Sequence, residues 1–248
     1  MKTKVIFLSC CALLGLSITA QAQWQGEWVI GFSGDLAERK GNLNVNLAYS
    51  GLPTLPRTDL IEEHTDRGYL GEIFGGYQVT CDNWLIGGEV NVELNDIDEP
   101  IHFAFTDIFH AVGWSASGHF KTKPVVGVTG RLGYQMASFL LAYLRLGVEG
   151  SKDTIDLTFT ADPAVLPVAI TLNDARWRAQ YIAGFGFEIP LPLYSCPSVR
   201  LEYIYRSYFN DRGVEDNGFI QTGFLNPFFS VSTHPRTQTG KLSVVWNF

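Results

Sequence analysis

Charged residues that alternate with apolar neighbours are the feature of this sequence with the clearest chemistry. Carboxylate and guanidinium groups form strong, charge-assisted hydrogen bonds, and one arginine often binds a carboxylate through two nitrogens at once. Six residues are the candidates for such an ion-pair network: Glu89, Arg131, Arg145, Glu188, Arg200 and Glu202. Other charges share the same alternation: Glu72, Glu93, Glu149, Arg178, Arg206 and Lys241. These residues predict pairing of opposite charges, provided that the fold brings their faces together.

The segment 84–95 shows the alternation most clearly. Glu89, Asn91 and Glu93 fall on one face, and the other face holds only apolar residues and glycine. Side chains alternate across a β-strand, so this pattern predicts a strand with one polar and one apolar face. Similar patterns predict seven further strands, at 27–36, 68–80, 124–136, 140–150, 176–189, 198–208 and 239–248.

The last of these strands ends in an aromatic residue, Phe248, and its apolar face also carries Trp246 and Leu242. In an exported protein this pattern suggests the final strand of an outer-membrane barrel. From residue 68 onward, no Lys, Arg, Asp or Glu falls on the apolar faces within the proposed membrane band. Because an arginine or lysine there would cost about 2–4 kcal/mol, this absence favours contact with lipid. We therefore predict an all-β fold, an eight-stranded antiparallel up-and-down transmembrane β-barrel.

The first residues have the composition of a secretory signal peptide. Two lysines precede an apolar stretch at 5–18, and Ala20-Gln21-Ala22 forms a small-residue cleavage site. The rival interpretations are an anchor helix and a lipoprotein signal around Cys10 and Cys11. The apolar stretch is shorter than the roughly 20 residues that a spanning helix needs, and Cys10 comes too early for a lipoprotein signal. The expected organisation is a signal peptide at 1–22 and an outer-membrane barrel domain at 23–248.

The predicted connections alternate in length. Short turns are expected at 80–83, 137–139 and 190–197, and long loops at 37–67, 96–123, 151–175 and 209–236. A barrel whose two termini lie in the periplasm has its short turns on that side and its long loops outside. Aromatic residues near the short turns predict an interfacial girdle. They are Tyr77, Trp84, Tyr134, Phe139, Trp246 and Phe248.

Three pairs of these strands resemble the OmpA-type family of outer-membrane barrels. The resemblance covers the strands from residue 68 onward and is carried by GGYQV at 75–79 with GE at 88–89, by GRLGY at 130–134 with YLRLG at 143–147, and by AGFGFE at 183–188 with RLEY at 200–203. It implies eight antiparallel strands around a narrow interior crossed by ion pairs. It also implies that Glu89, Arg131, Glu188 and Arg200 are the luminal acid, base, acid and base.

The sequence departs from that family at two points. Arg131 stands where the family has a lysine, which favours bidentate pairing. The sequence ends at Phe248 without the peptidoglycan-binding domain of full-length OmpA, so it looks closer to single-domain surface-antigen and opacity-type relatives.

The interior of an eight-stranded barrel is just wide enough to be filled by side chains. Its charges should therefore pair with one another, because buried charges persist only when they are paired. Counted along their strands, Glu89, Arg131 and Arg145 lie at similar heights. Two interpretations remain: a static polar core, which we favour, and a gate that opens when the pairs exchange partners.

Other residues predict less specific chemistry. Cys81 and Cys196 follow the signal and fall in predicted periplasmic turns, either as one disulfide across the barrel or as two independent thiols. The histidines of the second long loop are too widely spaced for a zinc site. Ser230, Ser232 and His234 lie close in sequence but lack a clear acid partner for a nucleophile and base. We therefore expect no enzymatic activity, no metal and no cofactor.

Charge and the apolar loops indicate the partners. Removal of the signal takes away two lysines and no acid, so the net charge falls from −7 to −9, which argues against a nucleic-acid partner. Aromatic residues of the loops form a contact surface, or pack on one another if the strands extend past the membrane. They are Phe105, Trp114, Phe224, Phe228 and Phe229.

The expected function is that of a structural or surface-antigen barrel in a Gram-negative outer membrane, with long outer loops that serve adhesion or partner binding. The alternative is a small gated, porin-like channel. The expected partners are outer-membrane lipid and lipopolysaccharide, the barrel-assembly machinery through Phe248, and a host or surface partner through the loops.

Overall fold

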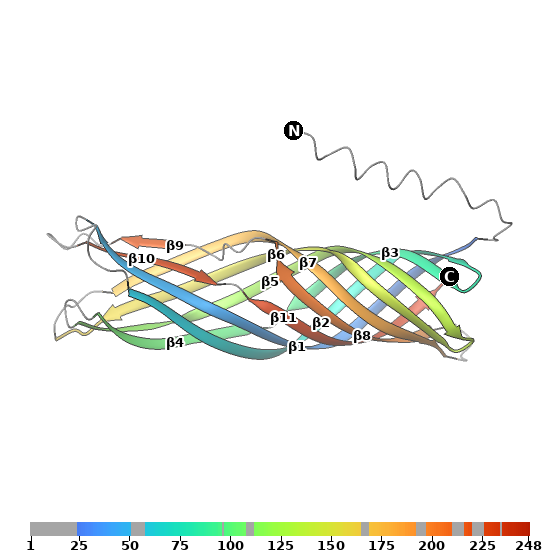
Figure 1. Cartoon of the computed structure of the whole chain (residues 1–248), viewed down its shortest axis with the longest axis horizontal. Helices are drawn as coiled ribbons and strands as arrows, with labels where there is room; N and C mark the ends of the chain where they lie inside the picture. The colour runs from blue at the N-terminus through green and yellow to red at the C-terminus, as the bar shows by residue number, and fades with distance from the viewer. Residues whose placement is uncertain are drawn as a thin grey trace, which may run out of the picture.

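The chain folds into a long antiparallel β-sheet that closes on itself (Figure 1). The computed structural model describes residues 24–50, 58–95, 97–107, 112–164, 169–191, 197–209, 216–219, 226–233 and 235–248. Among these residues none forms a helix that could span a bilayer. The predicted signal peptide lies outside the described residues. The strands are β1 (Gln25–Ser50), β2 (Thr58–Cys81), β3 (Trp84–Asn95), β4 (Asp98–Asp107), β5 (Val112–Ala137), β6 (Leu140–Ala161), β7 (Ala169–Pro190), β8 (Pro197–Tyr208), β9 (Asp216–Phe219), β10 (Asn226–Thr233) and β11 (Arg236–Asn247).

Eight strands form the closed ring, in the order β1, β2, β3, β5, β6, β7, β8 and β11. The seam between β1 and β11 is antiparallel and runs from Val29 opposite Asn247 to Lys40 opposite Arg236. Phe248 extends this seam, because its N–H donates to the Trp28 carbonyl at 3.0 Å and its carbonyl accepts from the Trp28 N–H at 2.7 Å. The prediction of an eight-stranded antiparallel barrel is confirmed.

One end of the barrel carries tight turns and a collar of aromatic side chains. Asp82 adopts a positive φ of 52° in the turn between β2 and β3, a conformation that aspartate tolerates better than most residues. Trp28 packs edge-on against Tyr77, and Trp84 against Tyr134, each pair with ring centroids 5.1 Å apart. The C-terminus lies at this end, and β4, β9 and β10 lie toward the other (Figure 1). The collar matches the predicted interfacial girdle.

The segments predicted as long loops are mostly strand, so that prediction was wrong for most of their described residues. The β1–β2 ladder continues as far as Leu47 opposite Thr58, and the β5–β6 ladder as far as Trp114 opposite Ala161. β4 continues the pairing of β3 with β5, and β10 continues the pairing of β11 with β1. The barrel wall therefore extends well beyond the eight predicted strands.

The reason for this error is an exchange of residue types between the two faces, which β6 shows clearly. Near the turns its inward residues include Arg145, and Leu146 faces outward with 62% exposure. Farther along the same strand Leu157 and Phe159 face inward, and Thr160 faces outward. The alternation never breaks, but the apolar side moves from the outer face to the inner face. A search for apolar residues on the outer face alone stops where this exchange occurs.

Candidate functional site in the barrel interior

Four charged residues nearest the tight turns form a closed set of ion pairs. Arg131 on β5 contacts Glu89 at 3.1 Å and Glu188 at 2.9 Å. Arg200 on β8 contacts the same two carboxylates, at 2.6 Å and 2.7 Å. Both arginine side chains are fully buried. Each arginine thus bridges strands β3 and β7 across the interior, and each acid is shared by two cations.

A second group of charges lies one step farther from the turns. Arg145 on β6 contacts Glu202 of β8 at 3.3 Å and Glu72 of β2 at 3.5 Å. Its Nε also donates to the Thr129 hydroxyl at 3.2 Å. Lys241 on β11 pairs with Glu72. The six residues predicted as a luminal network therefore all lie inside the barrel and all take part in ion pairs, but in two neighbouring groups.

A third group, which includes partners that the sequence did not assign, surrounds Arg206 of β8. This guanidinium contacts Glu93 at 2.5 Å and Glu149 at 2.8 Å. The Asn91 amide donates to Glu149 at 3.0 Å, and the Gln180 amide donates to it at 3.3 Å. Amide side chains therefore fill the hydrogen-bonding capacity that the single arginine leaves open.

Two aromatic rings help to position the cations. The guanidinium carbon of Arg131 lies 3.9 Å from the centre of the Tyr143 ring. Arg200 and Lys241 both lie over Phe74, at 5.3 Å and 5.4 Å from its ring centre. Ring faces attract cations, so these contacts help to hold the charged groups in place.

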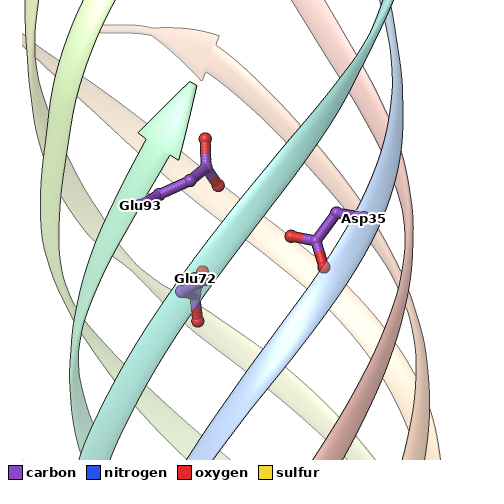
Figure 2. Close-up of side chains that lie close together, drawn as sticks. All are labelled: Asp35, Glu72 and Glu93. Carbon is purple, nitrogen blue, oxygen red and sulfur yellow. The ribbon is translucent and has the colours of Figure 1, made fainter. Parts of the chain in front are cut away.

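Three carboxylates, those of Asp35, Glu72 and Glu93, project into the interior from the neighbouring strands β1, β2 and β3 (Figure 2). One oxygen of each lies within 4.8 Å of the others, an arrangement that could hold a metal ion. Lys241 and Arg206 already supply positive charge to Glu72 and Glu93. Asp35 was missed by the sequence analysis, although its alternation with Phe32, Gly34 and Leu36 places it on the inner face.

Beyond the charges, toward the far end of the barrel, an apolar layer fills the interior. Arg39 lies at the junction of the two layers, with its guanidinium carbon 5.2 Å from the centre of the Phe120 ring. Asp153 lies there too and accepts hydrogen bonds from Thr122 at 2.9 Å and Tyr208 at 2.8 Å. The layer consists of Leu43, Val45, Ile101, Phe105, Trp114, Ala116, Phe120, Ile155, Leu157, Phe159, Ala161, Ile170, Leu172 and Val231.

This layer corrects part of the predicted contact surface. Phe105 and Trp114 are buried inside the barrel, because the strands that carry them extend past the membrane and turn these side chains inward. Their rings stack with centroids 6.5 Å apart. Phe228 and Phe229 belong to β10, and Phe224 lies outside the described residues. Of the two interpretations for these aromatic residues, packing on one another therefore describes Phe105 and Trp114.

The cysteines and histidines form no common site among the described residues. Cys81 is free and half-buried at the end of β2, and Cys196 lies outside the described residues, so the disulfide remains a prediction. His119 is an exposed strand residue rather than a loop residue, and it contacts Asp98 at 3.0 Å. Hydrogen bonds from Lys121 and His119 hold the pKa of Asp98 below its usual range.

Comparison with known proteins gives likeness of structure only. No protein-family model matches the chain, and no curated protein matches its sequence. The attachment invasion locus protein Ail of Yersinia pestis is 12% identical, with 87% of this chain and 99% of that chain covered and a TM-score of 0.36. Neisserial surface protein A is 10% identical, covering 86% and 97%, with a TM-score of 0.40. The outer membrane protease OmpT of Escherichia coli is 9% identical, covering 90% and 97%, with a TM-score of 0.42.

The environment of the barrel follows from its own surface. Large apolar side chains such as Ile73, Leu146 and Phe185 face outward and are half or more exposed. A closed ring pairs the backbone groups of its strands, which is what a chain needs to cross hydrocarbon as β-structure. With a polar interior behind the apolar belt, the chain is an outer-membrane β-barrel. The belt begins at the aromatic collar and ends near Leu36 and Tyr69, where outward residues become polar.

Proposed function

We propose that this protein is a closed surface-display barrel, which carries its outer hairpins away from the membrane for contact with another surface or molecule. The observation that supports this proposal most is that two layers of side chains fill the interior. Paired charges occupy the part inside the belt, and an apolar cluster of fourteen residues occupies the part beyond it. A channel needs a hydrated path, and both layers replace water with side chains.

The length of the barrel supports a display role. On β1, residues 38–50 continue the strand past the end of the belt. At a rise of about 3.3 Å per residue and a tilt of about 40°, these residues reach about 30 Å beyond the bilayer. The apolar layer gives this extension the interior of a soluble protein. The extension is therefore a rigid support for the segments that connect its strands.

The rival function, a gated channel, predicts a different electrical result. We expect the refolded barrel to show no discrete openings in planar bilayers, and we expect Glu89→Ala to remain closed. Removal of this carboxylate frees Arg131 and Arg200 from one partner, but the apolar layer lies at a different level and is untouched. Discrete openings in the wild type, or openings that appear in Glu89→Ala, would support the channel instead.

We propose that this protein is not an enzyme. Ser230 and Ser232 are half-buried residues of β10, and His234 lies outside the described residues. In the sequence these residues lack a clear acid partner for a nucleophile and base, which supports the proposal. We also propose that Phe248, which is 72% exposed at the seam, is the residue that the barrel-assembly machinery recognises.

Attachment through the outer end can be tested without disturbing the barrel. Deletion of 219–231 would remove most of β10, whose residues 226–233 pair with β1, so a narrower change is needed. We expect replacement of residues 220–225 by a Gly-Ser linker of equal length to reduce binding of expressing cells to a host-cell surface by about tenfold or more, since a few aromatic anchors dominate most interfaces. Replacement of 165–168 by the same kind of linker is the control. Equal binding by all three strains would contradict a role for this segment.

A further inference from the structure

A groove crosses the outer wall of the barrel at the level where the apolar belt ends. Four neighbouring strands, β2, β1, β11 and β8, form it, and their register sets one residue from each strand side by side. The row nearest the membrane is Tyr69, Leu36, Gly240 and Tyr203. The hollow at this row has a volume of about 430 Å³.

The floor of the groove is low because it contains glycine. A Cβ atom added to Gly240 would meet nothing within 4 Å, and the same holds for Gly34 and Gly71 in the row below. Tyr69 and Tyr203 stand at the two sides, with exposures of 77% and 41%. The result is an apolar trough that is continuous with the apolar belt on its membrane side. Its shape is suited to one hydrocarbon chain.

The rows above the trough are cationic. Arg67 and Glu38 lie opposite each other in the next row, and Lys40 and Arg236 lie opposite each other in the row beyond. A second hollow of about 410 Å³ adjoins the first and is lined by Lys40, Arg236 and Gln238. Two further acids lie nearby: Asp66, whose carboxylate accepts a hydrogen bond from the Arg67 N–H at 2.8 Å, and Glu63, one row higher and opposite Asn42. The three cations of these rows therefore lie just outside the hydrocarbon.

Glu38 lies inside the cationic rows and holds two of the cations together. Its carboxylate contacts Lys40 at 2.7 Å and Arg67 at 2.8 Å. Hydrogen bonds from both cations hold its pKa below the usual range, so it stays charged at neutral pH. Three cations beside the two acids Glu38 and Asp66 leave the surface with a net positive charge.

We propose that this groove binds a phosphate-bearing lipid of the outer leaflet, with an acyl chain against Leu36 and Gly240 and the phosphate against Arg67, Lys40 and Arg236. The inference rests on the proposed function, since it needs this end of the barrel to face outward. Charge complementarity selects an anionic head group. Continuity of the trough with the belt selects a lipid over a soluble anion. In the outer leaflet, the acylated and phosphorylated sugar anchor of lipopolysaccharide has this chemistry.

The test compares lipid binding by native mass spectrometry of the full processed barrel in a neutral detergent. The two probes are bisphosphorylated lipid A and the same lipid with its phosphates removed. We expect the wild type to bind the phosphorylated lipid more tightly, and Arg67→Ala with Arg236→Ala to weaken that binding about 25-fold, at about fivefold for each cation near an anionic head group. Gly240→Leu should weaken the binding of both lipids, because its side chain enters the trough.

A matched control removes two exposed cations away from the groove. Lys121 and Arg176 each pair with one aspartate, at 2.8 Å, as Arg67 pairs with Glu38. Lys121→Ala with Arg176→Ala should leave lipid affinity unchanged. Equal affinity of the wild type for both lipids, or equal losses in the two double variants, would overturn the proposal. Failure of the display function would appear separately, as channel openings or as unchanged cell binding, and neither measurement depends on this groove.

Discussion

Replacement of Arg200 by alanine is expected to lower the free energy of unfolding by about 3–5 kcal/mol, the cost of removing one member of a buried ion-pair cluster. The Arg200 Nη1 donates to Glu89 at 2.6 Å and its Nε donates to Glu188 at 2.7 Å. Without it, two carboxylates that are almost fully buried share only Arg131 and the Ser198 hydroxyl. The barrel would then contain a carboxylate charge that no cation compensates.

The measurement is denaturant unfolding of the barrel refolded into lipid vesicles, followed by tryptophan fluorescence. Arg176→Ala is the control, because Arg176 is exposed and its pair with Asp174 should contribute at most about 1 kcal/mol. Equal, small losses in both variants would show that water reaches the interior cluster.

A second variant separates loss of charge balance from loss of packing. Arg200→Ala combined with Glu188→Gln removes one positive and one negative charge, so the remaining pair of Glu89 and Arg131 is balanced. Its cost should be smaller than the sum of the two single changes by about 1–3 kcal/mol, the usual coupling within an ion network. Strict additivity would indicate that Arg200 stabilises the barrel mainly through its contact with Phe74.

The inward position of these charges could be predicted from the sequence, because a period of two fixes the face of each residue in a strand. The partners could not be predicted with the same certainty. Glu89, Arg131 and Arg145 were placed at similar heights, yet Arg145 forms its ion pairs with Glu202 and Glu72. The stagger between strands decides which charges meet across the interior, and alternation within one strand carries no information about it.

The outer half of the barrel was missed for a different physical reason. In this part, inward and outward residues alternate as strictly as they do within the apolar belt. The outer face, however, is in contact with water instead of lipid. Trp114 and Phe159 therefore lie in the interior of the barrel, although residues of the same types face lipid within the apolar belt. No turn signal marks the boundary on β6, which passes it without a break, although β5 shifts register between Thr122 and Val125. On β6 only a change in which face is apolar reveals the boundary.

This exchange of faces leads to a prediction on a single strand. Leu146→Arg should destabilise the barrel by about 2–4 kcal/mol, because Leu146 faces outward within the belt. Thr160→Arg should change stability by no more than about 0.5 kcal/mol, as for most exposed polar positions in water. Both residues lie on the outer face of β6 and both are exposed. The same denaturant unfolding in vesicles measures both changes.

The pair of variants distinguishes lipid from water at two points of one continuous wall. The strand, the residue added and the face are the same in both, so a large difference in stability reports the surroundings of the side chain. Similar costs at the two positions would mean that the hydrocarbon extends as far as Thr160 or does not cover Leu146. In either case the groove between Tyr69 and Tyr203 would no longer lie at a lipid–water boundary, and the height of the display end above the membrane would need a new value. A large cost at Leu146 alone fixes the boundary between them, which is where the cations of the outer wall begin.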